Sequence, residues 1–101
     1  MEAIYWLSES TRGDKKWRIR TPQGKLIHFG ARGYEDYTMH KDERRKENYI
    51  SRHASREDWS PSGINTAGFW SRWLLWNKES LEDSMDDIER NFGILIEWEP
   101  I

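Results

Sequence analysis

The chain of 101 residues contains no cysteine, and only three prolines and three histidines. Without thiols it can form neither a disulfide framework nor a thiolate zinc site. No apolar run approaches the roughly 20 residues of a membrane-spanning helix, so no membrane span is expected. The first residues, MEAIYWLSES, lack the basic start and long apolar centre of a signal peptide. These absences argue against the disulfide-rich secreted class and the membrane-spanning class.

Residue patterns that carry enzyme chemistry are missing as well. The glycine-containing stretch GARGY does not fit the phosphate-binding pattern GxxxxGK[ST], and no strained-elbow motif surrounds a serine. Three histidines remain, His28, His40 and His53. The last two fall on one expected helix, which separates them by about 20 Å, too far to share one metal ion. We therefore expect no enzyme activity, no catalytic residue, no metal site and no cofactor.

Tryptophan and charged residues, in contrast, are abundant. The chain has seven tryptophans, and 34% of its residues are charged while 36% are hydrophobic. Each tryptophan can bury a large apolar area. A chain of this length forms a single domain, residues 1–101. We expect a small folded domain whose core rests on a few bulky aromatic side chains.

Charge is divided unevenly along the chain. Residues 12–57 carry 13 Lys and Arg against 7 Asp and Glu, whereas residues 58–101 carry 3 against 9, and the net charge is −2. Such a division suits head-to-tail contacts, or a basic surface that meets an acidic partner. The alternative is that both sets form ordinary solvated faces.

Apolar periodicity predicts an α+β fold. Alternation of apolar and polar side chains indicates half-buried strands, and the sequence TPQG marks the turn of a hairpin over residues 16–29. Apolar spacing of three and four indicates helices. We expect strands at 3–8, 16–20, 25–29 and 94–98, and helices at 39–54, 66–76 and 81–92. Together they predict a small three- to four-stranded, mostly antiparallel sheet, made of the N-terminal hairpin and a C-terminal strand, packed on about three helices.

The stretch FWSRWLLW, residues 69–76, is apolar around most of a helix, which indicates near-complete burial. Ser80 and Gly93 are the expected start and stop signals of the last helix. The predicted core consists of Trp17, Phe29, Phe69, Trp73, Trp76, Leu81, Met85 and Ile88. Some of the remaining tryptophans, Trp6, Trp59, Trp70 and Trp98, are expected to be partly exposed, where they favour contacts with a partner.

The basic first half is the expected contact surface. The residues predicted to touch a partner are Tyr34, Tyr37, Arg44, Arg45, Arg52 and Trp59. An alternative is nucleic-acid binding, in which Tyr34, Tyr37 and Tyr49 stack on bases between basic side chains. Seven acids interrupt the same stretch, and the isoelectric point is near 5.9, which argues against that alternative.

Four sequence elements resemble those of a family of short uncharacterised proteins encoded by large double-stranded DNA viruses. They are HFG, DYT-x-HKD, RK-x-x-YI-x-RH and GFWSRWLLW, within roughly residues 15–92. The resemblance implies a viral structural protein, a minor capsid or cement-type virion component that makes protein–protein contacts. Its implied partners are other virion or capsid proteins, with nucleic acid as the alternative, and a homo-oligomer or higher assembly is left open. The implied location is the virion, and the host cytoplasm or nucleus during assembly.

Overall fold

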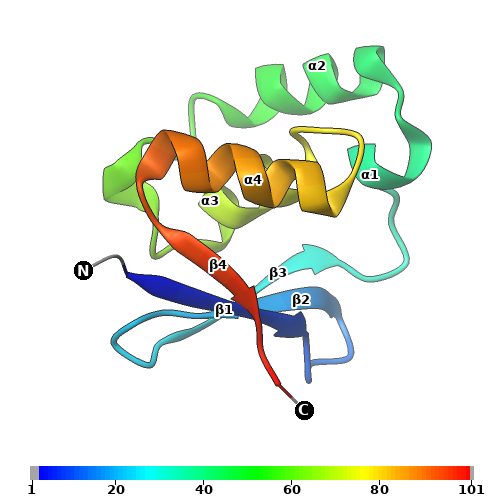
Figure 1. Cartoon of the computed structure of the whole chain (residues 1–101). Coiled ribbons are helices and arrows are strands. Elements are labelled where there is room, and N and C mark those ends of the chain that lie inside the picture. The colour runs from blue at the N-terminus through cyan, green and yellow to red at the C-terminus, as the bar shows by residue number, and fades with distance from the viewer. Residues whose placement is uncertain (1–2, 101) are drawn as a thin grey trace.

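Four strands form one mixed sheet in the computed structural model, which describes residues 3–100 (Figure 1). The strands are β1 (Ile4–Glu9), β2 (Lys15–Arg20), β3 (Leu26–Ala31) and β4 (Leu95–Trp98), in the spatial order β3-β2-β1-β4. β2 pairs antiparallel with β1 and with β3, whereas β4 pairs parallel with β1. The fold is α+β, and the predicted hairpin and C-terminal strand are confirmed.

One face of the sheet is apolar because side chains alternate along each strand. Leu7, Ile19 and Ile27 lie opposite one another on three neighbouring strands, and all three are buried. In Figure 1 the helices lie together on one side of the sheet. The core therefore sits between this sheet face and the helical layer.

The helical layer contains α1 (Tyr37–His40), α2 (Glu43–His53), a 3₁₀ turn η1 (Pro61–Gly63), α3 (Ala67–Trp70), a π-helical segment η2 (Ser71–Leu75) and α4 (Leu81–Phe92). The predicted signals bound α4. The Ser80 side chain accepts a hydrogen bond from the Asp83 amide, and Gly93 adopts φ 66°, a left-handed conformation that favours glycine.

The prediction of one continuous helix over 39–54 is wrong, because the chain breaks between α1 and α2. Lys41 has φ 55°, which ends α1. The Asp42 side chain then accepts hydrogen bonds from the amides of Arg44 and Arg45 and starts α2. These bonds satisfy two of the amides that have no partner at a helix start, so they offset the cost of the break.

The stretch FWSRWLLW forms α3 and η2 instead of a regular α-helix. The Trp76 amide donates to the Ser71 carbonyl at 3.2 Å, five residues back, so the last turn holds one residue more than an α-helical turn. Phe69 and Leu74 are fully buried in this segment. Trp70 is also fully buried, and its Nε1 donates to the Ile64 carbonyl at 2.7 Å.

The residues predicted to form the core fall into two groups. Buried are Phe29, Phe69, Met85 and Ile88; packed partly buried against them are Trp17, Trp73, Trp76 and Leu81. Among the tryptophans expected to include exposed rings, Trp98 is 46% exposed, whereas Trp70 is 0% exposed. The largest fully buried side chain is therefore Trp70.

Replacing Trp70 with alanine is expected to lower the free energy of unfolding by about 3–5 kcal/mol, because it removes a buried indole and leaves a cavity. Trp98→Ala is the matched control at an exposed position, and we expect it to cost less than about 1 kcal/mol. Urea denaturation of both variants measures the difference. Equal losses would contradict the assignment of Trp70 as the main core anchor.

Candidate functional site

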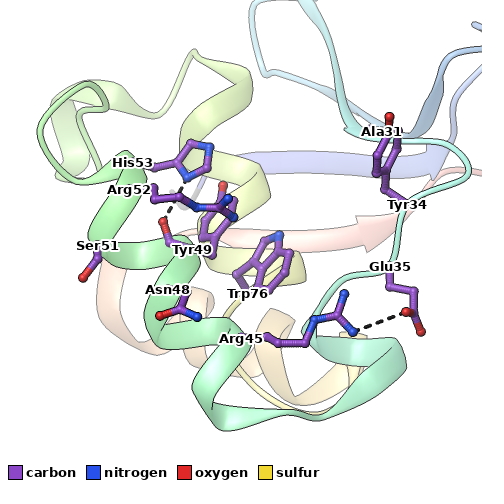
Figure 2. A pocket seen from close by; sticks show the side chains of 10 residues that line it. All are labelled: Ala31, Tyr34, Glu35, Arg45, Asn48, Tyr49, Ser51, Arg52, His53 and Trp76. Atoms are coloured by element: carbon purple, nitrogen blue, oxygen red, sulfur yellow. Dashed lines mark hydrogen bonds and ion pairs between the residues drawn. The ribbon is translucent and has the colours of Figure 1, made fainter.

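A groove of 720 Å³ runs between α2 and the loop that follows β3, and we call it the α2 groove (Figure 2). Its size lies in the range of pockets that hold ligands or partner side chains. Figure 2 shows Tyr34 and Glu35 on the loop side and the α2 side chains opposite. The lining residues are Ala31, Tyr34, Glu35, Arg45, Asn48, Tyr49, Ser51, Arg52, His53 and Trp76.

The stacked rings of Tyr49, Trp76 and His53 form the floor of the groove. Tyr49 stacks on Trp76 with ring centroids 4.4 Å apart and an interplanar angle of 2°. His53 stacks on Tyr49 at 4.2 Å. His40 does not line the groove, and its ring is tilted against Trp76 with centroids 5.4 Å apart. Two parallel rings at this distance from Tyr49 must occupy opposite faces of it. Tyr49 is thus enclosed on both sides, and we call the four rings the aromatic column.

Polar contacts fix α2 to α1 and to the segment after η2. The Tyr37 hydroxyl donates to Glu43 at 2.7 Å. Lys46 Nζ donates to the Asn77 carbonyl at 2.8 Å and lies 4.7 Å from the centroid of the Tyr37 ring. Because Tyr49 is the buried residue of α2, these bonds assist the aromatic column in holding the helix in place.

Trp76 is positioned by an arginine from the turn before it. Arg72 Nη1 donates to the Trp76 carbonyl at 2.6 Å. The Arg72 guanidinium carbon lies 4.4 Å from the Trp73 ring centroid and 5.6 Å from that of Trp59. Burial lowers the pKa of Arg72 below its usual value. Cation–π contacts with the two indoles offset part of that burial cost.

Two arginines give the groove its positive charge. Arg45 pairs with Glu35 at 3.3 Å, and both side chains are about half exposed. An exposed ion pair of this kind contributes little to stability, so Arg45 can exchange Glu35 for another carboxylate. Arg52 forms no ion pair within residues 3–100. The groove thus offers two guanidinium groups from one helix.

The structure places the predicted contact residues at different depths. Tyr34, Arg45 and Arg52 line the groove, and Arg44 is exposed on α2 outside the lining. Tyr37 is buried, and Trp59 lies beside the column with its ring centroid 6.4 Å from that of Tyr49.

The lining residues that the sequence did not predict as contacts are Ala31, Glu35, Asn48, Ser51, His53 and Trp76. The spacing 45, 48, 49, 52 marks one face of α2 and was a usable signal for Asn48.

The column leaves little ring surface for bases to stack on. Both faces of Tyr49 are covered, and Tyr37 is buried. Tyr34 is 73% exposed, so it keeps a free ring face. Of the three tyrosines that the nucleic-acid alternative relies on, the groove therefore offers one.

A serine and a histidine approach each other on the opposite side of the sheet. Ser10 Oγ lies 2.7 Å from His28 Nδ1 and also accepts a hydrogen bond from the Arg12 amide at 3.0 Å. Burial, Arg12 and Arg18 lower the pKa of His28. The serine hydroxyl thus holds the turn between β1 and β2 and contacts His28 on β3. We assign the pair a structural role at that turn.

Metal ligands do not gather in the part of the chain that the structure describes. Residues 3–100 contain no group of three or more His, Cys, Asp or Glu side chains able to hold a metal ion. Within the same residues no helix is long and apolar enough to cross a membrane.

Two tyrosines, Tyr37 on α1 and Tyr49 in the groove, predict how stability changes at high pH. A hydrogen bond to Glu43 raises the pKa of Tyr37 to about 12, and burial raises the pKa of Tyr49 to about 12. Because both values exceed the ordinary 10.0, the neutral phenols stabilise the fold below pH 10, and this contribution is lost as the pH rises through 12. We expect the free energy of unfolding, measured in urea, to fall over that interval.

The matched variant is the double substitution Tyr37→Phe with Tyr49→Phe, which has no phenol to ionise at either position. We expect its stability to fall less steeply over the same pH interval than that of the wild-type protein. All other ionisable groups are the same in the two proteins, so their contributions cancel in the comparison. Identical slopes would show that these two tyrosines do not carry the alkaline dependence.

Comparison with known families gives one local similarity. The model of a family of unknown function, DUF5754, matches residues 6–53. Neither the curated proteins nor the solved structures provide a match to the chain. The matched span runs from β1 to the end of α2 and includes every lining residue of the α2 groove except Trp76. The chain is therefore similar to this family over the segment that builds most of the groove.

Proposed function

We propose that this chain is a non-enzymatic binding protein that holds an acidic segment of another protein in the α2 groove. The observation that carries the proposal is the pair of guanidinium groups, Arg45 and Arg52, on one face of α2 above a closed aromatic floor. Guanidinium groups bind carboxylates through paired, charge-assisted hydrogen bonds.

The aromatic floor of the groove favours a protein partner over a nucleic acid. Base stacking by a polynucleotide needs several exposed ring faces in a row. In the aromatic column the ring faces are covered by the neighbouring rings. Ring edges, the Asn48 amide and the exposed Tyr34 ring remain for contacts. This combination suits a peptide segment that brings carboxylates and a bulky apolar side chain.

The sequence resemblance supports a virion as the setting of this contact. In that setting the protein is a minor capsid or cement-type component, and the acidic segment belongs to a neighbouring virion or capsid protein. The uneven charge of the chain supports the same kind of contact, because its basic half contains α2.

The test uses a synthetic 12-residue peptide of Glu, Asp and Leu residues as the probe and ¹⁵N-labelled protein. We expect the peptide to shift the amide signals of Arg45, Asn48 and Arg52. The double substitution Arg45→Glu with Arg52→Glu is expected to weaken binding at least about tenfold, because two charge-assisted contacts are lost. The matched control reverses two exposed arginines outside the lining, Arg44→Glu with Arg56→Glu.

Two outcomes would overturn the proposal. Equal loss of peptide affinity in both double variants would mean that the peptide is attracted only by the overall positive charge of the basic half. Tighter binding of a 12-nucleotide oligothymidylate, falling steeply between about 50 and 200 mM salt, would assign the groove to nucleic acid. A peptide in which Gln and Asn replace the acids should not bind, and circular dichroism confirms that each variant is folded.

A further inference from the structure

A second pocket lies at the rim of the sheet and shares no residue with the α2 groove. It has a volume of 500 Å³ and is formed where the end of β1 meets β2 and the C-terminal end of β4. In Figure 1 these strand ends lie together on the side of the molecule away from α2. We propose that this pocket binds the alkylammonium end of a lysine side chain from another protein.

Two tryptophans form adjoining walls of this pocket. Trp17 comes from β2 and Trp98 from β4, and the pairings Glu9–Trp17 and Leu7–Trp98 place both next to β1. Their ring centroids are 5.8 Å apart and their planes meet at 62°, so they form a corner. Indole faces attract organic cations more strongly than other aromatic rings do.

Exposure makes the corner reachable. Trp17 packs partly buried against the core, which fixes its ring, whereas nearly half of the Trp98 side chain is open to solvent. The exposed indole on this edge strand leaves apolar surface in contact with water, which is unfavourable. A ligand that covers this surface removes the unfavourable contact. The pair thus combines a fixed wall with an accessible one.

One carboxylate at the pocket, that of Glu9, can receive a cation. Glu9 lies opposite Trp17 on the neighbouring strand, is exposed, and forms no ion pair within residues 3–100. The positive Arg18 at the same pocket donates to Ser8 at 2.9 Å and pairs with Glu99 at 3.7 Å, and Glu99 also pairs with Arg20. Two arginines thus share the Glu99 carboxylate, and Glu9 is the acidic side chain at the pocket that forms no ion pair within the described residues.

This site is independent of the α2 groove. The groove presents guanidinium groups to an acidic partner, and the rim pocket presents indoles and a carboxylate to a basic one. Its test does not involve Arg45 or Arg52, so either assignment can fail while the other holds.

The experiment titrates ¹⁵N-labelled full-length protein with four probes at constant ionic strength. The first three are Nα-acetyl-lysine N-methylamide and its Nε-dimethyl and Nε-trimethyl forms. The fourth is the neutral isostere in which a tert-butyl group replaces the trimethylammonium group. Seven tryptophans give seven indole N–H signals, which Trp→Phe variants assign. We expect the lysine cations to shift the Trp17 and Trp98 signals, and the isostere to bind at least about fivefold more weakly.

Variants then locate the site. Trp98→Ala is expected to weaken lysine-probe binding at least about tenfold and Trp98→Phe less, in line with the order of ring strengths. Glu9→Gln is expected to weaken it about threefold. The control Glu97→Gln removes an exposed carboxylate from the residue before Trp98, and binding should stay within about twofold of wild type.

Three results would overturn the proposal. The isostere could bind as well as the cations, which would make the pocket a plain apolar slot. Trp98→Ala could bind like the wild-type protein while its thermal unfolding is unchanged. Glu97→Gln could weaken binding as much as Glu9→Gln does. The relative shifts caused by the unmodified, dimethyl and trimethyl probes show whether the recognised lysine is methylated.

Discussion

The stack of Tyr49 on Trp76 is the contact on which the candidate site depends. Helix α2 is the outermost helix in Figure 1, and Tyr49 is its buried residue. Such a helix has little apolar area with which to pack, and most helical stability in proteins comes from packing. The ring contact therefore decides whether α2, with Arg45 and Arg52, lies beside the loop that follows β3 and encloses the groove.

The position of Trp76, the second ring of that stack, depends on the core. Trp70 and its neighbours fill the space above the sheet, and the π-helical turn that follows shifts Trp76 around the helix relative to α-helical spacing. Arg72 holds the Trp76 carbonyl from the same turn. A single aromatic-rich stretch thus does two things, because its first residues build the core and its last residue supports the groove. The extra residue in the turn is what separates the two roles.

Much of the fold was predictable, and most of the site was not. An aromatic and apolar run predicts β1, alternation with period 2 predicts β2, and the TPQG turn predicts β3. Ser80 and Gly93 predict the ends of α4, because these signals are local. The break at Lys41 has no such signal, since lysine rarely adopts a positive φ. The groove joins α2 to Trp76, and α-helical spacing placed Trp76 on the core face with Phe69 and Trp73. The pairing that creates the site is therefore tertiary.

Amide hydrogen exchange on the variant Tyr49→Ala tests whether the aromatic column holds α2 in place. We expect the amides of α2 to lose their protection while those of β1 and β2 keep theirs, because α2 loses its buried ring and the sheet keeps its core. The control Tyr34→Ala removes an exposed groove residue and should leave α2 protected. Wild-type protection of α2 in Tyr49→Ala would show instead that contacts other than the aromatic column hold the helix.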